Sequence, residues 1–195
     1  MKAFIDLGSH KGKAIAKFMA SSEYSPEWEI HAFDPNPYLL MDYPERVIKH
    51  RLGAWIEDGE FNFYVNTKKV TGGGSSLLKE KQSGRLNKEQ SLIVRCINIG
   101  LWIKNRYKKN DMIIIKMDIE GAEYKVLESM LADGSLEYVD RIYIDVHSKK
   151  ALVNDDYSEA LLARVRNVTD VFPDYIESTK IKAGKIRWYD TRSQT

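Results

Sequence analysis

The sequence predicts an α/β fold with a mostly parallel sheet, because short apolar runs typical of strands alternate with segments whose apolar residues recur at helical spacing. The run at 112–118, MIIIKMD, opens with uninterrupted apolar residues, as expected of a strand buried on both faces of a parallel sheet. Polar residues directly follow several of the predicted strands. Ligands of such sheets bind beyond the carboxyl ends of the strands, so these residues form the candidate site.

The helices are predicted from apolar spacing and from their end signals. At 12–22, Ala14, Ile15 and Phe18 recur at helical spacing. The helix after the buried run ends at Asp133-Gly134, because glycine commonly closes a helix. The predicted strands are 3–7, 29–33, 46–50, 112–118 and 141–146, and the predicted helices are 12–22, 121–132 and 156–167.

The remaining segments are predicted from turn residues and polarity. Residues 36–44 form a helical stretch broken by prolines, and Asp58-Gly59 marks a turn before an alternating run, which predicts an antiparallel excursion. Residues 67–91 are polar, lack periodicity and contain Gly72-Gly73-Gly74, which predicts a surface loop or a partly helical flap with these glycines as its hinge. Two weak strands are expected near 175–178 and 185–190.

A chain of 195 residues and 22.5 kDa, 43% hydrophobic and 30% charged, has the size and composition of one globular domain over residues 1–195. No apolar run approaches the roughly 20 residues of a membrane span, and the N-terminus lacks the apolar core of a secretory signal. Cys96 has no second cysteine to pair with, which excludes an internal disulfide and a cysteine metal cluster. These features predict a cytoplasmic protein with a buried thiol.

The net charge of +2 is too small to favour a nucleic acid partner, because phosphate binding needs clustered positive charge. One local excess lies at 67–95, where seven basic residues stand against Glu80 and Glu89, a net of +5. This segment is either a solvated basic loop or a surface that faces an anionic substrate. Its basic residues are Lys68, Lys69, Lys79, Lys81, Arg85, Lys88 and Arg95.

A glycine loop, DLGSHKG at 6–12, joins the first predicted strand to the first helix. Gly8 permits a tight turn with positive φ, and Gly12 lets the helix start close to the sheet. The helix N-terminus adds N–H groups suited to a carboxylate or a phosphate. The G-x-x-x-G spacing is neither a dinucleotide fingerprint, which would have glycine in place of His10, nor a P-loop.

Asp34 follows the second predicted strand, 22 residues beyond Gly12. An acid at this place can accept hydrogen bonds from both hydroxyls of a ribose. Pro35 and Pro37 then end the strand and hold the turn. Together, the glycine loop and Asp34 predict a nucleoside ligand.

The segment IKMDIEGAE at 115–123 is the most specific feature of the sequence. It brings Asp118, Glu120 and Glu123 to the ligand-bearing edge of the sheet. Acids packed this closely repel one another unless a cation, a ligand amine or a proton relieves them. Helix capping by Asp118 and acids in the first helical turn would account for one or two of the three.

DLGSHKG, AFDPNP and IKMDIEGAEYKVLESM together resemble the FkbM-type family of S-adenosylmethionine-dependent methyltransferases, in order over about residues 3–148. The resemblance implies a Rossmann-like class I three-layer sandwich with a seven-stranded sheet in which one late strand is antiparallel. The two weak terminal strands could supply that strand.

The resemblance also implies S-adenosylmethionine as the cofactor. The loop at 6–12 would cradle its methionine part, Asp34 would bind its ribose, and Ala54 and Trp55 lie where such enzymes line the adenine. Core packing is the alternative for Trp55. The residues expected to contact the cofactor are Asp6, Gly8, Ser9, His10, Gly12, Asp34, Pro35, Asn36, Ala54, Trp55 and Asp118.

Methyl transfer to a hydroxyl of a carbohydrate or natural product is the implied reaction. The protein must align the acceptor oxygen with the methyl group and remove a proton, for which Asp118 and His147 are the candidate bases. Asp118, Glu120 and Asp145 could instead hold a hard divalent cation, although carboxylates alone do not define a metal site. The expected substrate contacts are Ser75, Ser76, Glu120 and Glu123.

Two departures from the family affect the acceptor site. The segment CINIGLWI at 96–103 lacks acids that the family often carries there, and the chain starts directly at the first predicted strand. The acceptor pocket is therefore expected from the flap at 67–91 or from a second copy of the chain. Disorder of the flap without function is the alternative.

Other functions were weighed against this one. The sequence has neither a Pro-Pro pair, as amino methyltransferases of nucleobases carry, nor the Pro-Cys of cytosine C5 enzymes, since Arg95 precedes Cys96. RNA ribose methylation is compatible with both absences. A catalytically idle cofactor-binding protein is also compatible, whereas a nucleotide-dependent oxidoreductase is disfavoured by the glycine spacing.

Overall fold

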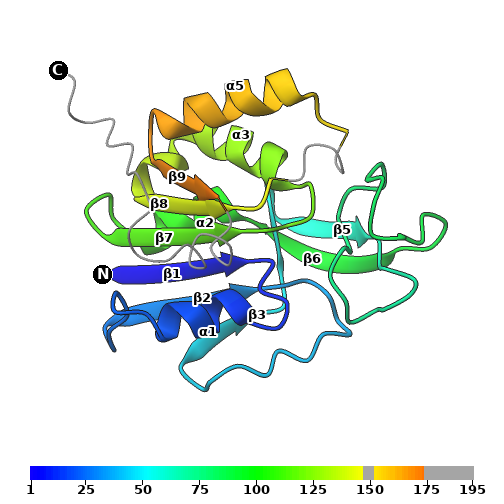
Figure 1. Ribbon diagram of the computed structural model, residues 1–195, viewed down its shortest axis with the longest axis horizontal. Coiled ribbons are helices and arrows are strands. Elements are labelled where there is room, and N and C mark those ends of the chain that lie inside the picture. Colours follow the sequence, from blue (N-terminus) through cyan, green and yellow to red (C-terminus); the bar gives the residue numbers. More distant parts are fainter. Residues whose placement is uncertain (147–151, 174–195) are drawn as a thin grey trace.

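A computed structural model describes residues 1–146 and 152–173. A central sheet with helices on both faces accounts for most of these residues (Figure 1). In chain order the elements are β1 (Lys2–Leu7), α1 (Lys13–Met19), β2 (Trp28–Phe33), β3 (Val47–His50), β4 (Gly53–Trp55), β5 (Gly59–Phe63), β6 (Leu92–Asn98), α2 (Ile99–Arg106), β7 (Met112–Met117), α3 (Glu123–Asp133), the 3₁₀ helix η1 (Ser135–Tyr138), β8 (Arg141–Ile144), α5 (Asp155–Arg166) and β9 (Asp170–Pro173).

The main sheet has six strands in the order β3-β2-β1-β7-β8-β9, and every neighbouring pair is parallel. The predicted α/β fold with a mostly parallel sheet is confirmed, but the strand count differs. β9 was not predicted, and it extends the sheet beside β8 as a parallel strand. The terminal strands expected near 175–178 and 185–190 lie outside the described residues, so the antiparallel seventh strand stays a prediction.

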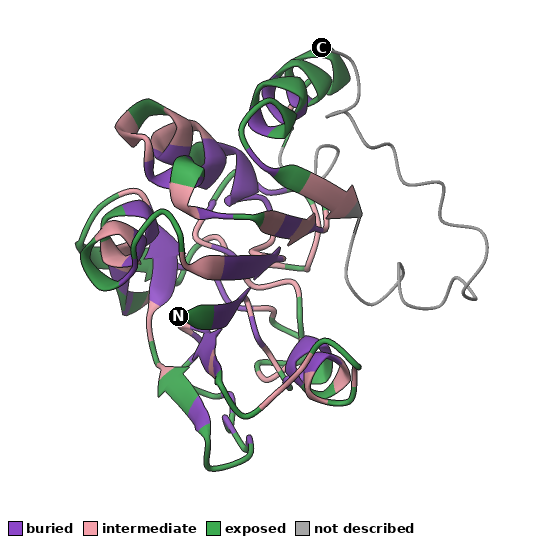
Figure 2. Ribbon diagram, turned by 90° about the vertical axis from the view of Figure 1, so that its left-hand side faces the viewer, coloured by how far each residue is buried: buried purple, intermediate pink, exposed green. Residues whose placement is uncertain are grey.

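Two apolar cores cover the faces of this sheet, and buried positions concentrate between the layers (Figure 2). On one face, Phe4 and Ile114 pack against Phe18 of α1. On the other, Ile5 and Ile115 share a core with α2, α3 and α5. Successive strand residues point to opposite faces, so a strand in the middle of the sheet must be apolar on both. The result is the expected three-layer sandwich.

A second, smaller sheet has the order β4-β6-β5. β5 pairs antiparallel with β6, and β4 pairs parallel with it. The antiparallel excursion predicted after Asp58-Gly59 therefore exists, but its partner strand is β6, which was not predicted. α2, which follows directly, was also not predicted, although Asn98 caps it by accepting a hydrogen bond from Leu101 N.

The helical stretch predicted at 36–44 is wrong, because no helix forms there. Asn36 Oδ1 instead accepts a hydrogen bond from Tyr38 N at 3.0 Å, the local turn that asparagine favours. Arg51 donates to the carbonyl oxygens of Asn36 and Leu39, which fixes the segment as a loop against β3.

The flap at 67–91 contains neither helix nor strand, so it is the surface loop and not the partly helical flap that the sequence also allows. Its path is nonetheless fixed, since Ser76 forms a β-bridge with Tyr64 and Leu86 forms one with Asn66. Gly74 has φ 95°, and a Cβ added there would lie 3.1 Å from the Cα of Gly84. Gly74 is thus a close crossing of two chain segments, and the hinge at 72–74 stays a prediction.

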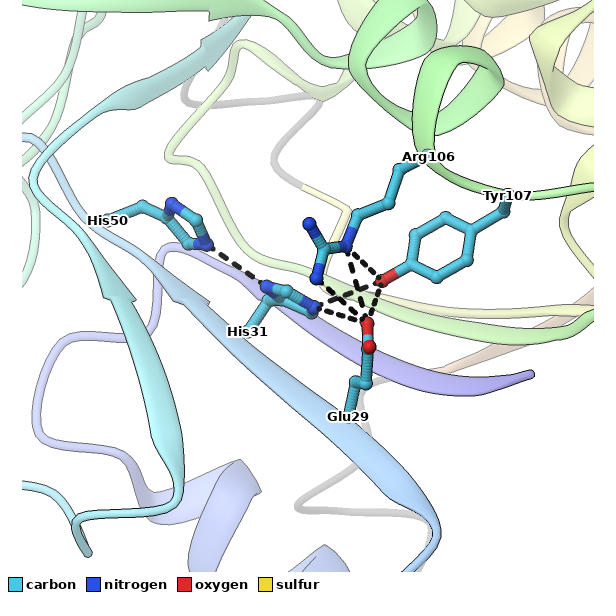
Figure 3. Close-up of polar contacts among 5 residues, drawn as sticks. All are labelled: Glu29, His31, His50, Arg106 and Tyr107. Carbon is cyan, nitrogen blue, oxygen red and sulfur yellow. Dashed lines mark hydrogen bonds and ion pairs between the residues drawn. The ribbon is translucent and has the colours of Figure 1, made fainter.

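A polar network joins the end of α2 to β2 (Figure 3). Tyr107 and Arg106 both donate to Glu29 Oε2, at 3.0 Å and 3.1 Å. Buried His31 places Nε2 3.0 Å from the Tyr107 hydroxyl and Nδ1 3.0 Å from Nε2 of His50. These contacts provide hydrogen-bond partners for the polar residues that alternate with the apolar residues of β2.

The described helices include none with the length and apolar character needed to cross a membrane.

Candidate functional site

A cleft opens at the carboxyl ends of β1, β2 and β7, where parallel sheets bind their ligands. Its walls come from the glycine loop, the turn after β2, the start of β4, the flap and the loop after β7. The lining residues are Gly8, His10, Phe33, Asp34, Pro35, Asn36, Gly53, Ala54, Phe63, Gly72, Gly73, Gly74, Ser75, Ser76, Leu77, Asp118, Ile119 and Glu120.

The glycine loop lies tightly against its neighbours. The N–H groups of Gly8 and Ser9 both donate to the carbonyl oxygen of Phe33 at 3.0 Å. Gly8 has φ 77°, and a Cβ there would lie 2.0 Å from the carbonyl oxygen of Asp118. Only glycine fits this position, which brings the backbone of the loop against the end of β7 and exposes it to the cleft.

Asp34 is almost fully buried at the end of β2. Its Oδ2 accepts a hydrogen bond from His10 N at 3.0 Å, and its Oδ1 accepts one from Asn36 N at 2.9 Å. Burial raises the pKa of this carboxyl, and the two backbone donors oppose the shift. A carboxylate offers about four acceptor positions, so both oxygens retain capacity for two ligand hydroxyls.

Tyr43 supports the glycine loop from outside the cleft, and the sequence did not single it out. Its hydroxyl donates to the carbonyl oxygen of His10 and lies 2.9 Å from Ser9 Oγ. A Cβ on Gly12, which has φ 69°, would lie 2.8 Å from the Tyr43 ring. The loop after β2 therefore holds both ends of the glycine loop.

Two lysines relieve the acids grouped after β7. Lys116 Nζ lies 3.3 Å from Asp118 Oδ2, and Lys81 Nζ lies 2.7 Å from Glu120 Oε2. Glu123 is buried and accepts from the N–H groups of Ile119 and Gly121. Within residues 1–146 and 152–173, no group of three or more His, Cys, Asp or Glu side chains is arranged to hold a metal ion.

Asp6 is completely buried beside the cleft and does not line it. The strand register pairs Asp6 with Lys116, whose Nζ lies 3.4 Å from Asp6 Oδ1. Burial raises the pKa of Asp6 to about 6, and the ammonium of Lys116 opposes that shift. Asp6 and Asp118 thus share one cation, since Lys116 lies between them.

Many of the predicted site residues meet in the cleft. These are Gly8, His10, Asp34, Pro35, Asn36, Ala54, Ser75, Ser76, Asp118 and Glu120. Ser75 Oγ accepts from Asn66 N, and Ser76 Oγ donates to the carbonyl oxygen of Glu120, so both hydroxyls also hold the flap in place.

Other predicted site residues lie away from the cleft walls. Trp55 packs in the core, its ring centroid 6.0 Å from that of Phe61, and does not line the cleft, whereas Ala54 does; the adenine contact stays a prediction. Glu123 caps backbone groups and is not placed to touch a substrate. Asp6, Ser9 and Gly12 lie behind the lining residues. His147 lies outside the described residues.

Several functional positions were missed by the sequence. Phe33, Phe63 and Ile119 give the cleft apolar walls, but their sequence context resembles that of ordinary core residues. Lys116 carries the clearest signal that could have been used, because it is a charged residue inside an otherwise apolar strand.

The flap meets the glycine loop and the turn after β2 as well as the acids after β7. His10 Nε2 lies 2.9 Å from the carbonyl oxygen of Thr71, and Asn36 Nδ2 donates to that of Val70 at 2.7 Å. The flap therefore crosses the mouth of the cleft and is held from both sides.

The family model of the FkbM methyltransferase domain matches residues 6–168, which include every element that forms the cleft. The chain belongs to this family. Neither the curated proteins nor the solved structures gave a significant match. The residues of this methyltransferase fit a nucleoside with a charged tail: an acid at the ribose position, apolar walls, a glycine loop with no room for a side chain, and carboxylates toward a cationic centre.

Proposed function

We propose that this methyltransferase uses S-adenosylmethionine to methylate a hydroxyl group of a carbohydrate or a small natural product. The observation that carries the proposal is the convergence of the glycine loop, Asp34 and Asp118 on one cleft. The resemblance of three ordered motifs to an O-methylating family supports the choice of a hydroxyl acceptor. S-adenosylmethionine, when bound, supplies an activated methyl group on a sulfonium.

The residues of the chain then have three tasks. Asp34 binds the ribose hydroxyls, and the apolar walls beside Ala54 and Phe63 contact the adenine ring. The loop at 8–12 holds the amino acid end of the cofactor. The carboxylates of Asp118 and Glu120 lie at the same cleft and favour a positive charge there over a neutral group.

Asp118 is the proposed base for the acceptor hydroxyl. Its side chain is 32% exposed and lines the cleft, and its ion pair with Lys116 fixes where the carboxylate lies. A base must come within hydrogen-bond reach of the proton that it removes, which a carboxylate at the cleft surface satisfies. His147 stays the alternative base that the sequence predicts.

The test is transfer of a labelled methyl group from S-adenosylmethionine to a panel of glycans and hydroxylated natural products, with RNA as a parallel acceptor. Label on a hydroxyl of a glycan or small molecule supports the proposal. Label on RNA ribose would show that the acceptor is RNA and not a carbohydrate or a small natural product. The Asp118→Asn variant should bind S-adenosylhomocysteine as the wild type does and lose turnover by about 10²-fold or more. Cofactor binding without transfer to any acceptor would favour the idle binding protein.

A further inference from the structure

The flap contains a lysine that is buried within it. Lys81 has a fully buried side chain, and its Nζ donates to the carbonyl oxygen of Gly74 at 2.7 Å. The same Nζ lies 2.7 Å from Glu120 Oε2, in the loop after β7. A buried ammonium is stable only when its charge is paired and its N–H groups are bonded. Glu120 pairs the charge, and the Gly74 carbonyl accepts one of the N–H groups.

Glu120 has an unusual backbone conformation that the flap also supports. Its φ is 57°, the left-handed region that a glutamate rarely adopts. Ser76 Oγ donates to the Glu120 carbonyl oxygen at 2.8 Å, and Ser76 is itself bridged to Tyr64. Two flap residues thus hold the backbone and the carboxylate of one glutamate, and a strained residue at a cleft indicates a functional constraint.

The rest of the flap is built around this ammonium. A Cβ on Gly84 would lie 3.0 Å from Lys81 Nζ and 2.2 Å from the carbonyl oxygen of Gly74. The two flap segments therefore meet at the lysine with no room for a side chain. Glu120 closes the cluster from the far side, and its side chain is 21% exposed at the cleft.

We infer that Lys81 is a positioning residue that makes the flap and Glu120 a single unit and so shapes the acceptor side of the cleft. The flap segment at 72–77 and Glu120 line the cleft together, so loss of the pair would move both at once. The assignment of this wall to the acceptor rests on the proposed function. The coupling between Lys81 and Glu120 does not.

Hydrogen exchange of backbone amides in the flap tests the coupling without any ligand. Lys81→Met and Glu120→Gln should each speed exchange at 67–91 by about tenfold or more, and the double variant should add little to either. Lys79→Met is the matched control, because Lys79 is an exposed lysine of the same flap and its loss should leave exchange unchanged.

Unchanged exchange in Glu120→Gln would overturn the inference even if Lys81→Met failed to fold, because glutamine keeps the size of Glu120, whose side chain is partly exposed. Strictly additive effects of the two substitutions would overturn it as well. The positioning role also predicts that Lys81→Met affects the acceptor and not the cofactor. In this variant, the affinity for S-adenosylhomocysteine should stay within about threefold of wild type, while the KM for a glycan that the enzyme methylates should rise about tenfold. Equal losses in both would contradict that role. If wild type binds no S-adenosylhomocysteine, the proposed function fails while the exchange result still decides the coupling.

Discussion

The charge of one side chain, Lys116, stabilises two carboxylates. It lies on β7 between fully buried Asp6 and cleft-lining Asp118, at 3.4 Å and 3.3 Å. Neither carboxylate oxygen of Asp6 has a hydrogen-bond partner in the described part of the chain, so the ammonium is its main stabilisation. The pKa of Asp6, already raised to about 6 by burial, should rise further without this charge.

Lys116→Met should therefore destabilise the fold by about 3–5 kcal/mol, the usual cost of leaving a buried charge unpaired. Chemical denaturation at pH 7 measures the loss. Asp6→Asn added to Lys116→Met should recover part of the lost stability, since it removes the unpaired charge. A double variant less stable than Lys116→Met alone would show that Asp6 is not what the lysine stabilises.

Tyr43 does not line the cleft, but its substitution should weaken ligand binding there. Tyr43→Phe keeps the ring against Gly12 and removes the bonds to Ser9 and His10. The glycine loop should then bind S-adenosylhomocysteine less tightly by about 0.5–1.5 kcal/mol, the net value of an ordinary hydrogen bond. Calorimetry measures this change, and an unaltered affinity in a folded variant would remove Tyr43 from the account.

At the scale of elements, the polar network between β2 and α2 makes stability depend on pH (Figure 3). Burial, together with a smaller contribution from the neighbouring His31, lowers the pKa of His50 to about 4. Below its ordinary value near 6.5, the unfolded chain takes up a proton that the folded chain refuses until about pH 4. Stability from this group is thus present above pH 6.5 and is lost as the pH falls to 4.

The effect of His50 on stability must be measured as the difference between a His50 variant and wild type. Asp6 is present in both proteins, and it changes the stability with pH in the opposite direction. The raised pKa of Asp6 makes the folded state take up a proton first between about pH 6 and 3.8. His50→Phe keeps the stacking on Phe33. From pH 7 to 4, this variant should gain about 1–2 kcal/mol relative to wild type in denaturant titrations, a value reduced for partial exposure. A difference that is constant with pH would contradict the assignment.

At the scale of the whole molecule, the sequence was enough for five of the six strands of the main sheet and for most cleft residues. Apolar runs such as 112–118 predict strands clearly, because a central strand of a parallel sheet is buried on both faces and is mostly apolar. β6 escaped because Ile93 is apolar yet exposed, which hides the alternation of buried and exposed positions. α2 escaped because it has only eight residues and carries Gly100 in its first turn. Residues 36–44 were misread because the turn at Asn36 outcompeted a helix.

The contacts between distant residues that assemble the site could not be predicted from the sequence. Lys81 and Glu120 are far apart in sequence, and nothing local marks either as a partner of the other. Tyr43 reaches the glycine loop only because Arg51 and Asn36 fix the loop between them. Trp55 was expected beside the adenine because it follows the third predicted strand, yet its ring packs in the core while Ala54 lines the cleft.

The most direct test of the account is calorimetric titration of the chain with S-adenosylhomocysteine and, separately, with NAD. The account predicts one S-adenosylhomocysteine bound per chain and no NAD. Asp34→Ala should weaken binding by about 1.5–3 kcal/mol, roughly 10- to 150-fold, whereas Asp42→Ala, at an exposed acid of the same loop, should not. Binding of NAD but not S-adenosylhomocysteine, or equal affinity in Asp34→Ala and wild type, would contradict it.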